Sequence, residues 1–251
     1  MFHLSATFLG LIYFSNSIQA AAIPIASGSH WYTGRNNNLE WKDCSRSNRP
    51  GRECTRVEVP LDWHDDAAGK ASLFVARYPA TNQPKLGTVF INPGGPVKNQ
   101  SFAIEPAYQN HHLVIALGWD PRGVGQTIPR IECFQTGQEQ VAFWNGSIVE
   151  NGLDVRGNFT SQNDLDDFYA QVDQVDHYLQ RFGKQCLATN ADALKHVGTA
   201  ATVRDMVAIH DILEGPDKPV NFWGLSYGTV LGIYFVNSKL YPRFMISSFC
   251  L

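Results

Sequence analysis

The chain has 251 residues, of which 44% are hydrophobic and 17% are charged, and its formal net charge is −3 at pH 7. This is an ordinary globular composition, and the length is sufficient for one sizeable core. The near-neutral charge, together with the lack of a basic run, gives no sign of a nucleic-acid-binding surface. We therefore expect no nucleic-acid partner.

The first 22 residues have the pattern of a secretory signal peptide. An apolar stretch from Leu4 to Phe14 is followed by the small-residue run Ala20 to Ala22. Cleavage after Ala20 or after Ala22 would fit this pattern. The stretch is too short to span a bilayer, which needs about 20 apolar residues. We expect a secreted, extracellular protein without stable membrane insertion. The alternative is a buried strand or helix at the start of the domain.

Three sequons agree with export, because N-glycosylation acceptors occur on the surface of secreted proteins. Their asparagines are Asn99, Asn145 and Asn158. Each sequon alone is a weak signal, since the pattern is short, so the three asparagines are candidate glycosylation sites.

The five cysteines are compatible with an oxidising compartment, where pairing is favoured. The preferred disulfides are Cys44 with Cys54 and Cys133 with Cys186, which leaves Cys250 over, although connectivity cannot be deduced from sequence. The chain has no CxxC or HExxH motif. The adjacent histidines 111 and 112 would point to opposite faces of a strand. We therefore expect no metal and no other cofactor.

Four strands are predicted in the first half of the chain. Residues 55–59 and 71–78 form two short strands separated by a turn. Residues 88–91 and 112–117 are continuous apolar runs, each closed by a glycine- and proline-containing loop. Runs that are apolar on both faces are typical of central parallel strands with helices on each side.

Three helices are predicted in the second half. Leu165, Phe168, Val172, Val175 and Leu179 recur at three- and four-residue steps, which predicts a helix over 163–183 with one stripe facing a core and Gly183 at its end. A second helix is predicted over 199–213, with Gly215 as its stop. The third, over 229–240, is apolar nearly all round and is expected to be buried. Strands that alternate with helices indicate an α/β fold.

The pentapeptide Gly224-Leu225-Ser226-Tyr227-Gly228 lies between an apolar run (220–223) and the third predicted helix. This context is typical of a nucleophile elbow, where a serine is held on a sharp strand-to-helix turn. Ser226 is the candidate nucleophile, and the Tyr227 backbone N–H is a candidate oxyanion donor. The second donor is expected from the loop that contains Gly94 and Gly95. The alternative is that these two glycines only shape a turn.

Five blocks in order carry a resemblance to a known family. They are Val59-Pro60-Leu61-Asp62-Trp63, Val75-Ala76-Arg77, Asn92-Pro93-Gly94-Gly95-Pro96, Gly118-Trp119-Asp120-Pro121-Arg122-Gly123-Val124-Gly125 and Gly224-Leu225-Ser226-Tyr227-Gly228-Thr229. Over about residues 40–243 the chain resembles the secreted tripeptidyl aminopeptidases of the prolyl-iminopeptidase-like group. The resemblance implies an α/β-hydrolase fold with a parallel sheet flanked by helices. It also implies a serine exopeptidase that releases short peptides from free N-termini of peptide substrates.

The chain departs from this family at two places. Val97-Lys98-Asn99-Gln100 replaces the glycine-rich continuation of the loop after Pro96, and no His, Asp or Glu follows Ser226. The triad order of this fold is Ser, then Asp or Glu, then His, so the expected Asp and His have no counterpart. His177, His196 and His210 lie upstream and are poor candidates for a base.

The sequence therefore predicts the N-terminal part of the fold only: a signal peptide over 1–22 and an incomplete domain over 23–251. Residues 244–251 do not fit the family, and the strand over 220–223 is expected to form an open sheet edge. Asp120 is expected to build its turn, and Arg122 to tie that turn to nearby carbonyls. The chain as written is expected to be inactive as a peptidase. The alternatives are a non-catalytic pseudoenzyme or gene-model fragment, and an esterase or lipase.

Overall fold

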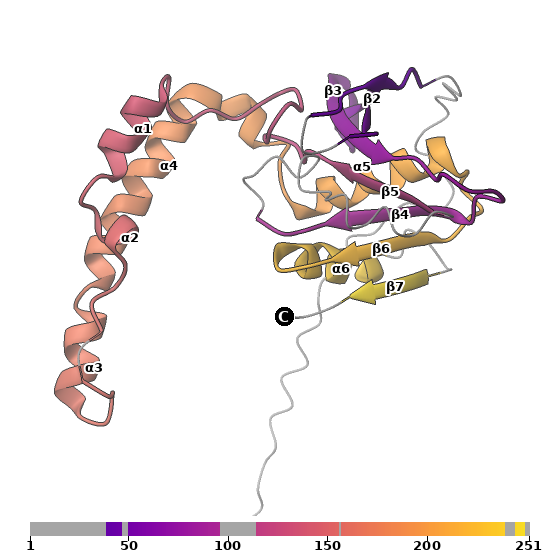
Figure 1. Ribbon diagram of the computed structural model, residues 1–251. Coiled ribbons are helices and arrows are strands. Elements are labelled where there is room, and N and C mark those ends of the chain that lie inside the picture. The colour runs from indigo at the N-terminus through magenta and orange to yellow at the C-terminus, as the bar shows by residue number, and fades with distance from the viewer. Residues whose placement is uncertain (1–38, 47–49, 96–113, 156, 239–243, 249–251) are drawn as a thin grey trace, which may run out of the picture. The chain divides into compact units, whose positions relative to one another are not determined.

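The structure is a computed structural model that describes residues 39–46, 50–95, 114–155, 157–238 and 244–248 (Figure 1). The predicted signal peptide, Asn99, the residues that follow Pro96, the two adjacent histidines and Cys250 lie outside the described residues. No helix in the described ranges is both long and apolar enough to cross a membrane.

A mixed sheet with the strand order β1-β2-β3-β5-β4-β6-β7 forms the centre of the fold (Figure 1). β5, β4, β6 and β7 run parallel to one another, whereas β1, β2 and β3 pair antiparallel and β3 joins β5 antiparallel. The strands are β1 (Lys42–Asp43), β2 (Glu53–Asp62), β3 (Asp65–Tyr78), β4 (Gly87–Asn92), β5 (Val114–Trp119), β6 (Val220–Gly224) and β7 (Phe244–Ser248). The predicted parallel centre is present, and the hairpin β2–β3 extends it on one side.

The predicted open edge at β6 is wrong. β7 pairs parallel with β6 along its whole length, from Val220 opposite Phe244 to Gly224 opposite Ser248. A parallel ladder requires only backbone donors and acceptors in register. A short segment outside the family resemblance can therefore add as the next strand.

Two helices pack against the sheet near the elbow, α5 (Thr199–Leu213) and α6 (Tyr227–Asn237). The core lies between them and the strands, and its fully buried members include Phe90, Leu117, Met206, Phe222 and Leu231. The predicted bounds of α5 are confirmed, and Val203 and Met206 on this helix are buried. The all-round burial expected for α6 is wrong, because its outer face is exposed. That face carries Val230, Ile233, Tyr234 and Val236.

The remaining helices form a separate helical segment between β5 and α5: α1 (Gly137–Trp144), α2 (Ile148–Asn151), α3 (Gln162–Tyr169) and α4 (Val172–Leu194). The single helix predicted over 163–183 is wrong, because the chain breaks between α3 and α4. Gln171 at the break donates from Nε2 to the Asp154 carbonyl at 2.8 Å and accepts the Asp154 N–H at 2.7 Å. These tertiary bonds favour the break.

The predicted buried stripe of this helix is also wrong in part. Val172 and Leu179 are more than half exposed. α4 continues through Gly183 and ends at Leu194, with non-helical backbone angles at Asn190. A single glycine weakens a helix by only about 1 kcal/mol, so it does not have to end one.

Two disulfides are formed, Cys44–Cys54 and Cys133–Cys186, with Cα–Cα distances of 5.8 Å and 4.3 Å. They are the two pairs preferred from the sequence. The first closes the short link between β1 and β2. The second attaches residue 133, which precedes α1, to the middle of α4.

Candidate functional site

Ser226 lies on a sharp turn between β6 and α6. Its backbone angles are φ 53° and ψ −121°, a conformation that non-glycine residues rarely adopt. The turn is closed by hydrogen bonds from the Gly228 N–H to the Leu225 carbonyl at 2.8 Å and from the Thr229 N–H to the Ser226 carbonyl at 2.9 Å. Ser226 is exposed, and its hydroxyl makes no capping bond to α6. The strained turn therefore presents the hydroxyl outward.

The two glycines of the elbow are required by close packing. A Cβ at Gly224 would overlap the backbone of Gly228, and a Cβ at Gly228 would overlap the carbonyl oxygen of Asn92. Side chains at either position would push α6 away from β6 and β4. The G-x-S-x-G spacing thus follows from how tightly the turn is folded against the end of β4.

The glycine loop after β4 lies directly against the candidate nucleophile. A Cβ at Gly94 would lie 2.6 Å from the Ser226 Cβ and 3.0 Å from its Oγ. The Leu225 N–H donates to the Asn92 carbonyl at 2.9 Å, and the Gly94 N–H donates to Asn92 Oδ1 at 3.0 Å. Asn92, which is fully buried, therefore links the turn that carries Ser226 to the glycine loop after β4. At Gly95 a Cβ would meet nothing within 4 Å.

Tyr227 is the first residue of α6, so its N–H has no carbonyl acceptor within its own helix. Its hydroxyl is 2.8 Å from Thr199 Oγ1, at the start of α5. The half-buried ring also packs against the core. The backbone of Tyr227 is fixed by α6 and its side chain by Thr199 and the core, so its N–H has a defined position beside Ser226.

In the described part of the chain, the Ser226 hydroxyl has no hydrogen bond to a histidine or a carboxylate. His210 is fully buried, with Nε2 3.2 Å from the Pro219 carbonyl oxygen and Nδ1 3.2 Å from Asp211 Oδ1. His196 Nδ1 lies 3.7 Å from Asp62 Oδ2. Within those same ranges no three His, Cys, Asp or Glu side chains are grouped to hold a metal ion.

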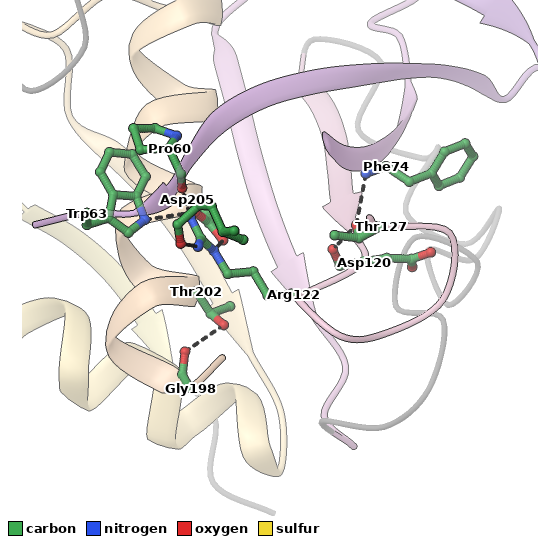
Figure 2. Close-up of polar contacts among 10 residues, drawn as sticks. Pro60, Trp63, Phe74, Asp120, Arg122, Thr127, Gly198, Thr202 and Asp205 are labelled. Carbon is green, nitrogen blue, oxygen red and sulfur yellow. Dashed lines mark hydrogen bonds and ion pairs between the residues drawn. The ribbon is translucent and has the colours of Figure 1, made fainter. Parts of the chain in front are cut away.

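Arg122, in the loop after β5, forms a buried ion pair with Asp205 on α5 (Figure 2). Arg122 donates to both carboxylate oxygens of Asp205, at 2.7 Å each, and to the carbonyls of Pro60 and Leu61. The Trp63 indole N–H donates to Asp205 Oδ1 at 3.0 Å. Complete burial raises the pKa of Asp205, while Arg122 and Trp63 act in the opposite direction. The network joins the end of β2, the loop after β5 and α5.

The sequence predicted the carbonyl contacts of Arg122 but not Asp205 or Trp63. Helical spacing gave no signal, because Asp205 is two residues after Val203 and one before Met206, and such neighbours do not share a helix face. A buried carboxylate needs a partner. Asp120 builds its turn as expected: its Oδ2 accepts the Gln126 N–H at 2.9 Å.

Of the sequon asparagines, Asn145 and Asn158 are described, and both are exposed. Asn145 ends α1, and Asn158 Oδ1 accepts the Thr160 hydroxyl at 2.5 Å. Ser147, in the first of these sequons, is fully buried and caps α2.

A serine on a strained turn, placed between a central parallel strand and a helix with a glycine loop against it, is the arrangement that defines the α/β-hydrolase elbow. The chain has part of the α/β-hydrolase fold, with a mixed sheet flanked by helices, as predicted.

The chain is similar to several serine hydrolases. It is 29% identical over 205 residues to the serine protease Hip1 of Mycobacterium tuberculosis, a match that covers 77% of this chain and 36% of the relative. It is 28% identical over 218 residues to a tripeptidyl aminopeptidase of Streptomyces lividans, with 81% and 36% covered. A Mycobacterium tuberculosis protein named carboxylesterase B is 29% identical over 160 residues, with 61% and 27% covered.

The chain thus spans about a third of the length of these curated relatives. No protein-family model matches it. Among solved structures, acetyl xylan esterase 1 from a Thermoanaerobacterium species is 14% identical, with a TM-score of 0.40 over 82% of this chain and 50% of the esterase.

Proposed function

We propose that Ser226, the Tyr227 N–H and the Gly94–Gly95 loop form the nucleophile and oxyanion half of a serine-hydrolase active site. The approach of Gly94 to Ser226 carries this proposal, because a carbonyl attacked by Ser226 Oγ needs donors beside the same atom. Ser226 Oγ would attack the carbonyl carbon, and the Tyr227 N–H would donate to the oxygen as it becomes negative. Asn92 would position the loop against the elbow.

The reaction requires a general base as well. A serine hydroxyl is a weak nucleophile until a histidine, oriented by a carboxylate, accepts its proton. The described residues give no such contact to Ser226. A catalytically complete form of the protein therefore requires a His and an Asp or Glu in addition to the residues of this half-site.

The substrate class that we propose is a peptide with a free N-terminus, from which the protein releases a short peptide. The relative from Streptomyces lividans named tripeptidyl aminopeptidase and the five sequence blocks support this. An esterase is the second candidate, favoured by the relative named carboxylesterase B. A non-catalytic role is the third, favoured because no histidine or carboxylate of the described residues contacts the Ser226 hydroxyl.

The test begins with sequencing the native transcript from the Ser226 codon to its 3′ end, followed by purification of the product that it encodes. That product is assayed with a tripeptide p-nitroanilide, the same anilide N-acetylated, and p-nitrophenyl butyrate. Cleavage of the free tripeptide anilide alone, lost in Ser226→Ala, is the expected result. Cleavage of the ester alone would favour the esterase. A product without a downstream Asp and His, and without turnover of any substrate, would favour the non-catalytic role.

We also propose that the protein is exported, glycosylated and processed after residue 20 or 22. The exposure of Asn145 and Asn158 and the two disulfides support this. N-terminal sequencing of secreted protein, and a mass decrease on treatment with a peptide N-glycosidase, are the measurements. A product retained in cells with an intact N-terminus would contradict the proposal.

A further inference from the structure

The two sequons of the helical segment differ in how their third residue is held. N-glycosylation requires the Ser or Thr hydroxyl at this position as well as the asparagine amide. An acceptor sequon must therefore present both groups to the transferase at the same time. Asn145 and Asn158 are both exposed, so the asparagines alone do not distinguish the two sites.

Ser147 is the third residue of the first sequon, and it is fully buried. It is the N-cap of α2. Its Oγ accepts the Glu150 N–H at 3.2 Å, and its own N–H donates to the Trp144 carbonyl at 2.9 Å. The Gly146 N–H, in the middle of the sequon, donates to Glu150 Oε2 at 2.9 Å. The hydroxyl that a transferase needs is thus enclosed, although the asparagine two residues before it is exposed.

The chain on the N-terminal side of this sequon is also fixed. α1 and α2 lie along α4 (Figure 1). The ring centroid of Trp144, at the end of α1, lies 5.2 Å from that of Phe182 on α4. The Cys133–Cys186 disulfide joins the residues before α1 to the same helix. Presenting the Ser147 hydroxyl to an enzyme therefore requires α2 to unwind or to leave α4.

Thr160, the third residue of the second sequon, is exposed. Its hydroxyl and its N–H donate to Asn158 Oδ1, at 2.5 Å and 3.1 Å. Both of these bonds lie within the sequon, which precedes α3 and its N-cap Ser161. Breaking them frees the amide and the hydroxyl together without unfolding a helix.

We propose that folding of the helical segment controls glycosylation at Asn145 but not at Asn158. The transferase modifies Asn145 only on chain that has not yet formed α2, whereas Asn158 stays an acceptor in the folded protein. Because Cys186 is synthesised after Asn145, the growing chain passes through a state in which the first sequon is free. The fraction of Asn145 that carries a glycan then depends on how fast this segment folds. The inference rests on the proposed glycosylation of the protein and adds its order relative to folding.

The test is glycosylation in vitro of the 251-residue chain, made without glycans in bacteria, by a purified oligosaccharyltransferase with a lipid-linked oligosaccharide. One sample is oxidised and folded, as checked by circular dichroism and by its two disulfides, and the other is reduced, alkylated and unfolded. Mass spectrometry of proteolytic peptides measures the rate at each asparagine.

We expect the unfolded chain to be modified at both sites. In the folded chain, the rate at Asn158 should stay within about threefold of that value. The rate at Asn145 should fall about tenfold or more, because its modification then requires a rarely populated open state of the helical segment.

Glu150→Pro tests the cap directly, because proline has no N–H to donate to Ser147 Oγ. In the oxidised chain this variant should restore most of the rate that the unfolded chain shows at Asn145, and it should leave Asn158 unchanged. Gln162→Pro is the matched control. Residue 162 is the first residue of α3, where proline is tolerated, so neither rate should change.

Equal rates at Asn145 in the folded and unfolded unmodified chains would overturn the proposal, and this comparison needs no variant. A folded chain in which Asn158 is shielded as strongly as Asn145 would overturn it as well. An unchanged low rate at Asn145 in Glu150→Pro would overturn the assignment of the shielding to α2. An unfolded chain that accepts no glycan at either asparagine would contradict the proposed glycosylation itself.

Discussion

Gly94 and Ser226 approach so closely that the Cβ of any other residue at position 94 would lie 2.6 Å from the Ser226 Cβ and 3.0 Å from its Oγ. The two residues are 132 positions apart in the chain, and Asn92 joins them by bonding to both the Leu225 and Gly94 N–H groups. The glycine loop and the elbow therefore form one rigid unit, although they follow different strands.

Gly94→Ala should be more damaging than Gly95→Ala. Both glycines have positive φ, 95° and 67°, so both alanines carry backbone strain of about 1–2 kcal/mol. Only the alanine at position 94 also overlaps the elbow, which adds about 1–3 kcal/mol. Urea unfolding of the two variants measures the difference. Equal unfolding free energies would show that the loop does not rest against Ser226.

Ser226→Gly should be more stable than Ser226→Ala, by about 1 kcal/mol. The φ of 53° and ψ of −121° strain any residue with a Cβ, and glycine removes that strain at a smaller entropic cost. The comparison isolates the backbone, because both variants lack the hydroxyl. Thermal and urea unfolding measure it. An alanine variant as stable as the glycine variant would mean that the turn is not strained.

These local features could be predicted from the sequence because they depend on neighbours in the chain. The elbow follows from its two glycines between a strand and a helix, and α5 follows from its apolar periodicity and Gly215. The outward-facing apolar residues of α6 show the limit of such reasoning. A composition that is apolar all round does not reveal which face is covered.

The features that were missed depend on distant partners. Asp205 is bonded to Trp63 and Arg122, which lie 142 and 83 residues away in sequence. The break before α4 depends on the bonds of Gln171 to Asp154, 17 residues upstream. The pairing of β7 with β6 likewise depends on backbone register instead of side-chain pattern. Periodicity contains none of this information.

Asp205→Ala should be among the most destabilising substitutions in the chain. It leaves the Arg122 guanidinium buried without its carboxylate, which costs about 3–5 kcal/mol. Trp63→Phe removes the N–H donor together with part of the buried indole ring and should cost about 1–3 kcal/mol. Asp192→Ala is the matched control, because its ion pair with Lys195 is exposed to solvent and should contribute little to stability. Urea unfolding of the three variants ranks their losses of unfolding free energy. A loss for Asp205→Ala as small as that for Asp192→Ala would contradict this account.

The 251-residue chain should not cleave a tripeptide p-nitroanilide. No His, Asp or Glu follows Ser226, and no histidine contacts its hydroxyl in the described ranges. In a serine peptidase, loss of the base lowers turnover by about 10⁶-fold, as much as loss of the whole triad. The purified chain and its Ser226→Ala variant should therefore show the same background rate.

Turnover by the unmodified chain that disappears in Ser226→Ala would contradict this prediction and show that an upstream group acts as the base. His196→Gln and His177→Gln would then be compared. The first removes the imidazole beside Asp62, and the second removes an exposed imidazole on α4. Loss of activity in His196→Gln alone would identify the imidazole paired with Asp62 as that base, because glutamine keeps the polarity of the position but cannot accept the serine proton.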